Sequence, residues 1–170
     1  RYIFDEIGYN LKPLDLQASM GLEQIKKLDE MHSKRKANFK RLHKIFSKYP
    51  RLFHLPTTYD KADVSWFGFL ITLKDDVSFA KNELVDHLEG AKIQTRSYFT
   101  GNALFHPAYL DIAKKYKDPR NEFPNATKST IDTFFMGVWP GMTEEQLDYI
   151  EKVVHKFCWQ YDSTWRNLKD

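Results

Sequence analysis

The chain has 170 residues, of which 42% are apolar, 15% aromatic and 29% charged, and it contains a single cysteine. This composition is enough for one domain with a core, and it excludes wholesale disorder. No run of about 18 apolar residues predicts a membrane span. The lone Cys158 excludes an internal disulfide and indicates a reducing compartment, so we expect a cytoplasmic protein. Because the chain opens with Arg1 rather than Met, we also expect a piece of a longer protein.

Basic residues gather between positions 26 and 51. Ten Lys and Arg stand there against two acids, so this stretch carries +8 and the remainder −5 of the total charge of +3. Such a stretch could attract nucleic acid, a membrane surface or a phosphorylated ligand. We favour a solvated helical face, because no nucleic-acid-binding motif accompanies the charge, and we expect neither nucleic acid nor membrane as a partner.

Residues 13–49 carry apolar side chains at alternating steps of four and three, which predicts one long helix. Pro13 suits its first turn and Pro50 ends it. His32 and Arg35 interrupt the apolar stripe, and we expect a solvated or ion-paired break there, with the two halves packed on different bodies. We therefore divide the chain into an interdomain segment with the long helix, residues 1–50, and a small α+β domain, residues 51–170.

The rest of the chain alternates strands and helices. Aromatic and β-branched runs predict strands over residues 65–73, 92–99 and 133–139, and helical spacing predicts helices over 78–88, 107–116 and 125–132. Thr143 and Gln146 form a capping box that opens a final helix. This order predicts an α+β fold in which a sheet of about three strands is covered on one side by helices.

Few residues suggest chemistry of their own. The glycines match no phosphate loop or dinucleotide fold, and no zinc motif is present. His155 and Cys158 lie one turn apart but are too few for a metal site, so we expect a structural role. Arg96, inside a strand, fits an internal salt bridge and a ligand contact equally well. Asn102 follows Gly101 and is most simply a turn residue.

The segment Gly8-Tyr9-Asn10-Leu11-Lys12-Pro13 places an aromatic ring, an amide and a cation at the entrance of the long helix. Helix N-termini attract phosphates through their free amides and the positive end of the dipole. The segment is thus a candidate anion site. The simpler alternative is that these residues only cap and solvate the helix.

Residues 7–30, IGYNLKPLDLQASMGLEQIKKLDE, resemble the G-Y-N-x-[RK]-x-x-x-x-Q-A-x-x-G-L-x-Q-L segment of the DegT–StrS family of pyridoxal-phosphate (PLP) enzymes. These are nucleotide-sugar aminotransferases and dehydratases. WFGF, QTR, HPAY and PGMTEEQLDYI follow in the family's order. Gly101-Asn102 after the T-R pair, together with FFMGVWPG, resembles the 3-dehydrase branch. Within it the resemblance is to the CDP-4-keto-6-deoxyglucose type first, with the GDP-4-keto-6-deoxymannose type close behind.

The resemblance implies the small C-terminal domain of a fold-type-I PLP enzyme, preceded by its long connecting helix. The catalytic Lys or His of the family lies upstream, so it implies no catalytic and no metal-binding residue here. It implies that Asn10 reaches the cofactor phosphate of the other subunit. Substrate contacts would come from the positions that match the family's motifs, namely Tyr9, Lys12, Arg96 and Asn102, with Lys12 facing the pyrophosphate.

The whole enzyme would use PLP or its amine form (PMP) to remove the C3 hydroxyl of a 4-keto-6-deoxy sugar nucleotide in deoxysugar and O-antigen synthesis. Its implied partners are the nucleotide-diphosphate sugar, the missing N-terminal PLP domain, a second copy in a homodimer and, as a candidate, an iron–sulfur reductase. We expect this chain alone to be inactive and free of PLP. Two alternatives stay open: a fragment of a sugar-nucleotide aminotransferase, and a non-catalytic module that uses the basic helix.

Overall fold

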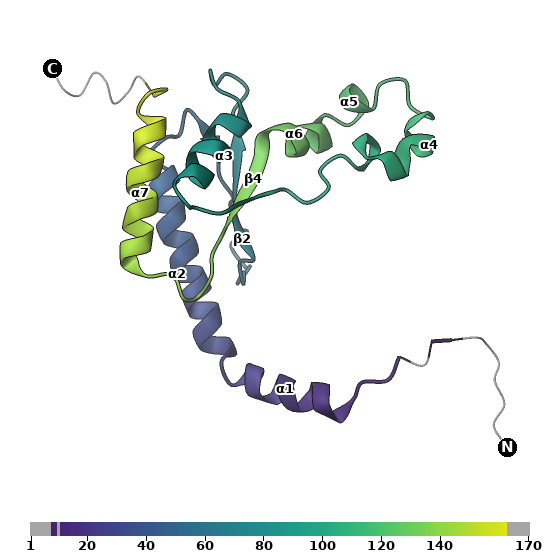
Figure 1. Cartoon of the computed structure of the whole chain (residues 1–170), viewed down its shortest axis with the longest axis vertical. Coiled ribbons are helices and arrows are strands. Elements are labelled where there is room, and N and C mark those ends of the chain that lie inside the picture. Colours follow the sequence, from purple (N-terminus) through teal and green to yellow (C-terminus); the bar gives the residue numbers. More distant parts are fainter. Residues whose placement is uncertain (1–7, 10, 163–170) are drawn as a thin grey trace.

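The computed structural model describes residues 8–9 and 11–162. Its elements, in chain order, are α1 (Asp15–Ile25), α2 (Leu28–Phe46), β1 (Phe53–His54), β2 (Gly68–Leu73), α3 (Lys81–Gly90), β3 (Thr95–Ser97), the short 3₁₀ helices η1 (Ala103–Phe105) and η2 (Pro107–Tyr109), α4 (Leu110–Ala113), α5 (Pro119–Glu122), α6 (Pro124–Asp132), β4 (Thr133–Gly137) and α7 (Glu144–Cys158). The predicted α+β class is confirmed by this mixture (Figure 1).

The four strands form one antiparallel sheet in the order β1-β2-β4-β3. Strands β2 and β4 pair along their length, from Gly68 opposite Gly137 to Thr72 opposite Thr133. Strand β3 lies at the edge, with Arg96 opposite Phe135. A fourth strand, β1, was not predicted, because its two residues are too short to show a period-two pattern.

One face of the sheet carries the core. Alternate residues of β2 and β4 point to this inner face, where they pack against α2, α3 and α7 (Figure 1). Its buried side chains include Phe69, Ile71, Leu73, Phe134 and Met136 from the strands, and Leu42, Phe46, Leu84, Leu88, Leu147 and Val154 from the helices. The predicted cover of helices on one side is thus confirmed, and α6 lies toward the other side of the sheet (Figure 1).

The single helix predicted over residues 13–49 is wrong. The chain turns at Lys26 and Lys27, and α1 extends to one side from the N-terminal end of α2 instead of continuing along the same axis (Figure 1). At the turn, the Lys27 N–H donates to the Gln24 carbonyl at 3.0 Å. This bond joins residues three apart, which gives a tighter turn than the four-residue spacing of an α-helix. None of the residues of α1 is buried, whereas α2 is anchored from Asn38 onward, so no packing holds the two helices in line.

The strand predicted over residues 92–99 shrinks to Thr95–Ser97. Lys92 and Phe99 have positive φ angles, 63° and 44°, and this left-handed backbone cannot continue a strand. The other predicted elements are found with shifted ends, and α5 and η1 were not predicted. Thr143 caps α7 as expected: its hydroxyl accepts from the Gln146 N–H at 3.2 Å, and the Gln146 side chain accepts from the Thr143 N–H at 3.1 Å.

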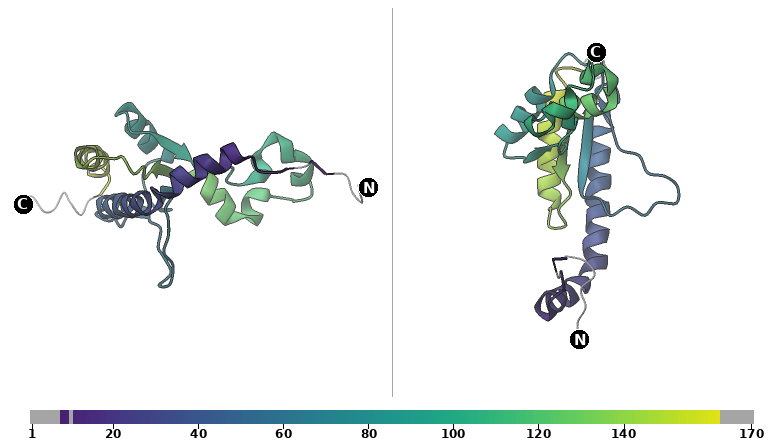
Figure 2. Two further views of the ribbon diagram at one scale, coloured as in Figure 1. Left: turned by 90° about the horizontal axis from the view of Figure 1, so that it is seen from below. Right: turned by 90° about the vertical axis from the view of Figure 1, so that its right-hand side faces the viewer.

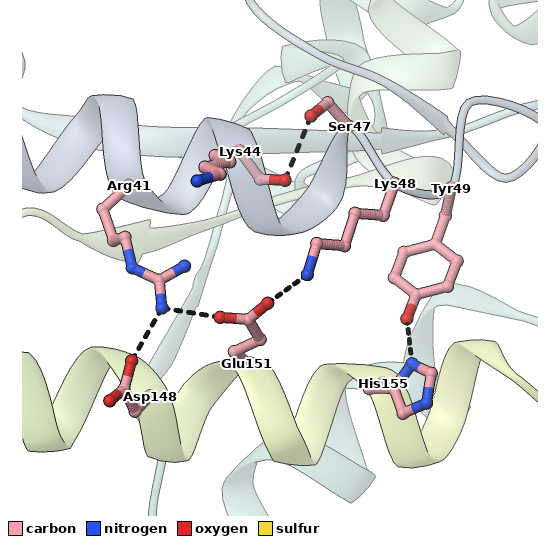
Figure 3. A network of polar contacts seen from close by, with 8 residues as sticks. All are labelled: Arg41, Lys44, Ser47, Lys48, Tyr49, Asp148, Glu151 and His155. Atoms are coloured by element: carbon pink, nitrogen blue, oxygen red, sulfur yellow. Dashed lines mark hydrogen bonds and ion pairs between the residues drawn. The ribbon is translucent and has the colours of Figure 1, made fainter.

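Part of the basic charge in and just after α2 is paired with acids of this chain. Arg41 donates to Asp148 at 2.7 Å and to Glu151 at 2.6 Å, and Lys48 pairs with the same Glu151 (Figure 3). Near the break in the apolar stripe, His32 and Lys36 contact Asp63, and Arg35 donates to the Trp66 carbonyl at 3.1 Å. Of the two residues at the break, His32 therefore lies beside an acid, whereas Arg35 bonds a backbone carbonyl. In the described part of the chain, no helix is long and apolar enough to cross a membrane.

Candidate functional site

The N-terminal candidates face solvent. Tyr9 is 94% exposed, and Lys12 is exposed as well. Asn10 lies outside the described residues. At the start of α1, the Gln17 side chain accepts from the Leu14 N–H at 2.9 Å, which satisfies one of the free amides of the helix end. The segment leading into α1 is therefore open to a second body.

Arg96 projects from the outer face of the sheet, because its cross-strand partner Phe135 is an outward residue of β4. Its side chain is exposed, and no ion pair holds it among residues 8–9 and 11–162. The neighbouring Glu89 accepts from the Thr95 N–H and hydroxyl, which lowers the pKa of Glu89, with a smaller contribution from the charge of Arg96. Of the two alternatives for Arg96, the ligand contact is the one this geometry leaves open.

Asn102, by contrast, is only 3% exposed. Its side-chain oxygen accepts from the Leu104 N–H at 3.1 Å, and its amide nitrogen contacts the Pro119 carbonyl and the Thr127 hydroxyl, both at 3.3 Å. Its own backbone N–H donates to the Thr130 hydroxyl at 2.6 Å. These contacts hold the loop after β3 against α5 and α6.

A small cavity of about 190 Å³ opens beside this loop. Its lining is rich in hydroxyl groups and includes Ser97, Thr100, Ser129 and Thr130, with Phe99 and His106 at its wall. A larger groove of about 410 Å³ runs between the sheet edge and α7, past Trp139, Met142 and Tyr149. None of the predicted site residues that the structure describes lines this larger groove.

Sequence reasoning missed the exposed phenylalanines at the outer face, Phe67 and Phe99. Both stand in aromatic runs that read as buried strand. The available signal for Phe99 was Gly101, two residues later, where the φ angle of 59° lets the backbone turn. Phe67 directly precedes Gly68, the first residue of β2, and so lies just outside the strand.

His155 and Cys158 belong to the packing between α2 and α7. The Tyr49 hydroxyl and His155 Nδ1 lie 2.5 Å apart (Figure 3), and Cys158 is fully buried. Burial raises the pKa of both the Tyr49 phenol and the Cys158 thiol, so neither is primed as a nucleophile at neutral pH. The described residues contain no group of three or more side chains that could hold a metal ion.

The candidates come from two different parts of the fold. Figure 2 shows α1 and the segment before it at one end of α2, whereas the sheet lies alongside α2. Tyr9 and Lys12 precede α1, and Arg96 belongs to β3 of that sheet.

Known proteins are similar to this chain over most of its length. Residues 1–155 match the model of the DegT/DnrJ/EryC1/StrS aminotransferase family. The chain is 38% identical, over 92% of its length, to dTDP-4-dehydro-2,6-dideoxy-D-glucose 3-dehydratase of Saccharopolyspora spinosa, of which it covers 33%. It is equally similar, 38% over 92%, to the lipopolysaccharide biosynthesis protein RfbH of Salmonella typhimurium, of which it covers 35%.

Solved structures with a similar fold cover most of this chain. A GDP-4-keto-6-deoxymannose-3-dehydratase with bound GDP-perosamine superposes with a TM-score of 0.74 and 27% identity, over 90% of this chain and 38% of the other. An aminotransferase from Psychrobacter cryohalolentis, at 13% identity, shares the fold with a TM-score of 0.81 over 95% of this chain and 42% of the other. The chain thus spans about a third of the length of the curated relatives it matches. With nearly its whole length matched, the chain belongs to the DegT/DnrJ/EryC1/StrS aminotransferase family.

Proposed function

We propose that this chain is the C-terminal portion of a PLP-dependent sugar-nucleotide 3-dehydratase. One observation carries the proposal: relatives at 31–38% identity include 3-dehydratases named for a dTDP sugar and for a GDP sugar. The enzyme would replace the C3 hydroxyl of a 4-keto-6-deoxyhexose nucleotide by hydrogen, with water as the leaving group and with two electrons drawn either from the amine form of the cofactor, restored by an amino donor, or from the implied iron–sulfur reductase. This chain would contribute substrate and dimer contacts to an active site completed by the upstream domain.

The described residues are consistent with a chain that supports an active site without carrying its catalytic lysine. The cofactor, when bound, supplies the electron sink for breaking the C3–oxygen bond. Lys81 is half-buried, and burial lowers the pKa of its ammonium group. Lysines with a lowered pKa can act as nucleophiles. The Nζ of Lys81, however, donates a hydrogen bond to the Thr130 carbonyl at 2.6 Å, which favours a structural role at the end of α6. This supports a cofactor-binding lysine or a catalytic histidine in the upstream domain.

Each candidate residue then has a task. Asn10 would hold the cofactor phosphate of the partner subunit, while Tyr9 and Lys12 would approach the substrate from the open N-terminal segment, with Lys12 near the pyrophosphate. Arg96 would meet the substrate from the outer face of the sheet. The contacts of Asn102 support a positioning task within its loop, in place of direct substrate contact.

The alternatives make different predictions. An aminotransferase would add nitrogen to the sugar, whereas a 3-dehydratase removes oxygen without adding nitrogen. The non-catalytic module with a free basic helix is disfavoured, because Arg41 and Lys48 are paired with acids of α7.

The test is product analysis by mass spectrometry. The full-length protein, loaded with PLP and supplied with an amino donor, is incubated with CDP-, dTDP- and GDP-linked 4-keto-6-deoxy sugars, both with and without an iron–sulfur reductase and NADH as the source of two electrons. We expect a product that lacks the C3 hydroxyl for at least one nucleotide. An amino sugar as the only product would establish the aminotransferase, and no conversion of any of the three would reject the proposal.

A further inference from the structure

Three phenylalanine rings form a cluster on the outer face of the sheet. Phe67 and Phe99 lie with ring centroids 6.1 Å apart, and each lies 5.7 Å from the ring of Phe135. Phe135 is largely covered, but Phe67 is 69% and Phe99 is 70% exposed. Two neighbouring aromatic rings thus present an open apolar surface at the end of β2 and β4.

The backbone is shaped to hold this cluster. Gly68 lies under the Phe135 ring, and a Cβ there would come within 2.6 Å of the Phe135 side chain. Phe99 has a φ angle of 44°, a left-handed conformation that is costly for a bulky aromatic residue. Such strain persists only where the surrounding structure enforces it, and it gathers at functional sites. Here it turns the Phe99 ring onto Phe135 while leaving it open to solvent.

Polar groups suited to a nucleotide flank the cluster. Arg96 lies opposite Phe135 in the β3–β4 register and therefore projects from the same face, exposed and without an ion pair among the described residues. Phe99 also forms part of the wall of the 190 Å³ cavity lined by the hydroxyls of Ser97 and Thr100. An aromatic surface, an exposed cation and a set of hydroxyl groups therefore lie next to one another on this side of the sheet.

We propose that the outer-face cluster of Phe67, Phe99 and Phe135 is a stacking surface for the base of a nucleoside diphosphate, with Arg96 facing the diphosphate. This inference deepens the proposed function, on which it rests for the substrate class. Bases stack on aromatic side chains whatever their identity, and phosphates favour the arginine fork. A purely apolar partner would explain the phenylalanines but would leave the charge of Arg96 without an acceptor.

The test measures binding without turnover. Full-length protein loaded with cofactor is titrated calorimetrically with CDP, dTDP and GDP, and separately with inorganic pyrophosphate. Phe99→Ala and Phe67→Ala should each weaken the preferred nucleoside diphosphate by about tenfold and leave pyrophosphate unchanged. Arg96→Ala should weaken both ligands. Tyr59→Ala is the matched control, since Tyr59 is an 89% exposed aromatic residue of the loop before β2.

A second variant separates stacking from packing. Phe99→Tyr should retain nucleotide affinity, while Phe99→Leu, which keeps apolar volume, should lose it. If Phe99→Leu binds as tightly as the unchanged protein, or if the alanine variants weaken pyrophosphate as much as the nucleotide, the stacking surface is refuted. Loss of PLP and a lower melting temperature, with nucleotide affinity intact, would instead identify the face as a domain contact. Selective nucleotide binding without any conversion of the sugar would reject the proposed function alone.

Discussion

The backbone N–H of Asn102 donates a hydrogen bond to the Thr130 hydroxyl at 2.6 Å, so the loop after β3 is fixed to α6 at one point. The Thr130 hydroxyl in turn donates to the Ala126 carbonyl at 3.0 Å within α6. The side chain of Asn102 adds contacts to Leu104, Pro119 and Thr127, so a single buried residue connects both ends of the loop.

Asn102→Ala should therefore destabilise this loop. The substitution leaves the Leu104 N–H without its acceptor and removes the contacts to Pro119 and Thr127, which should lower the free energy of unfolding by about 1–3 kcal/mol. Hydrogen exchange of residues 103–123 should speed up more than that of the core strands. Asn82→Ala, at an exposed position of α3, is the control. Equal effects of the two substitutions would contradict this role.

Gly101→Ala should be destabilising for a different reason. Gly101 has a φ angle of 59°, and a Cβ there would lie 2.2 Å from Thr130 Oγ1 and 2.9 Å from Thr130 Cα. Strain and overlap together should cost about 1–3 kcal/mol. Chemical denaturation checks this against Gly137→Ala, where a Cβ meets no atom within 4 Å. A loss no greater than that of Gly137→Ala would show that the loop yields freely.

Periodicity predicted the elements that carry the core. Strands β2 and β4 and helix α7 have long apolar patterns, and each was found close to its expected position. The same reasoning failed between α1 and α2, because a continuous 3.6-residue pattern does not reveal whether anything packs against its first half. It also extended β3 too far, since the left-handed backbone at Lys92 and Phe99 follows from tertiary contacts and not from the residue types.

Glu151 should make stability depend on acid pH. Hydrogen bonds from Lys48 and then Arg41 lower the pKa of Glu151 in the folded chain (Figure 3). A carboxylate with a lowered pKa in the folded protein stabilises the fold at pH values above the pKa of the unfolded chain, which is about 4.3 for Glu. The stabilisation is lost as the pH falls through the pKa of the folded protein. Because Glu151 is partly solvated, we expect a contribution of about 1 kcal/mol at pH 7.

Glu151→Gln should thus lower stability at pH 7 and flatten its decline between about pH 5 and pH 3. Urea denaturation at a series of pH values measures both changes. Glu144→Gln, which removes an exposed acid at the start of the same helix, should leave the slope nearly unchanged. A parallel pH dependence in unchanged protein and Glu151→Gln would show that the pairs in Figure 3 contribute nothing to stability.

Helix α1 should drive self-association of the isolated chain. Its large apolar side chains are more than half exposed, with Leu16 at 73%, Leu22 at 65% and Ile25 at 67%. Exposed apolar stripes of this kind favour association. Sedimentation should show concentration-dependent association, and the double variant Leu22→Gln/Ile25→Gln should reduce it. A strict monomer with slowly exchanging α1 amides would contradict the prediction.

The candidate site was only partly predictable. A motif resemblance can identify Arg96 and Lys12, because each stands within a short sequence motif that resembles one of the family. It cannot show that Asn102 turns inward, since this depends on Thr127 and Thr130, which lie on another helix. Nor can it show the outer-face cluster, in which Phe67 and Phe135 come from different strands or their flanks.

Lys12 and Asn10 should affect different ligands of the full-length enzyme. Lys12 is exposed at the entrance of α1, and under the proposed function it meets the substrate pyrophosphate, whereas Asn10 meets the cofactor phosphate. A charge-assisted contact to phosphate predicts that Lys12→Ala weakens sugar-nucleotide binding by about 10- to 100-fold and changes PLP binding little. Asn10→Ala should do the reverse.

Under the proposed function both residues act on the partner subunit, as the family resemblance implies for Asn10. A heterodimer that joins an Asn10→Ala subunit to one lacking the catalytic base should therefore retain at most one working site. Titrating PLP and sugar nucleotide separately against each variant decides the matter, with Lys27→Ala, at the exposed turn between α1 and α2, as the control for Lys12. Small and equal changes for both ligands would mean that these residues only cap and solvate the start of α1.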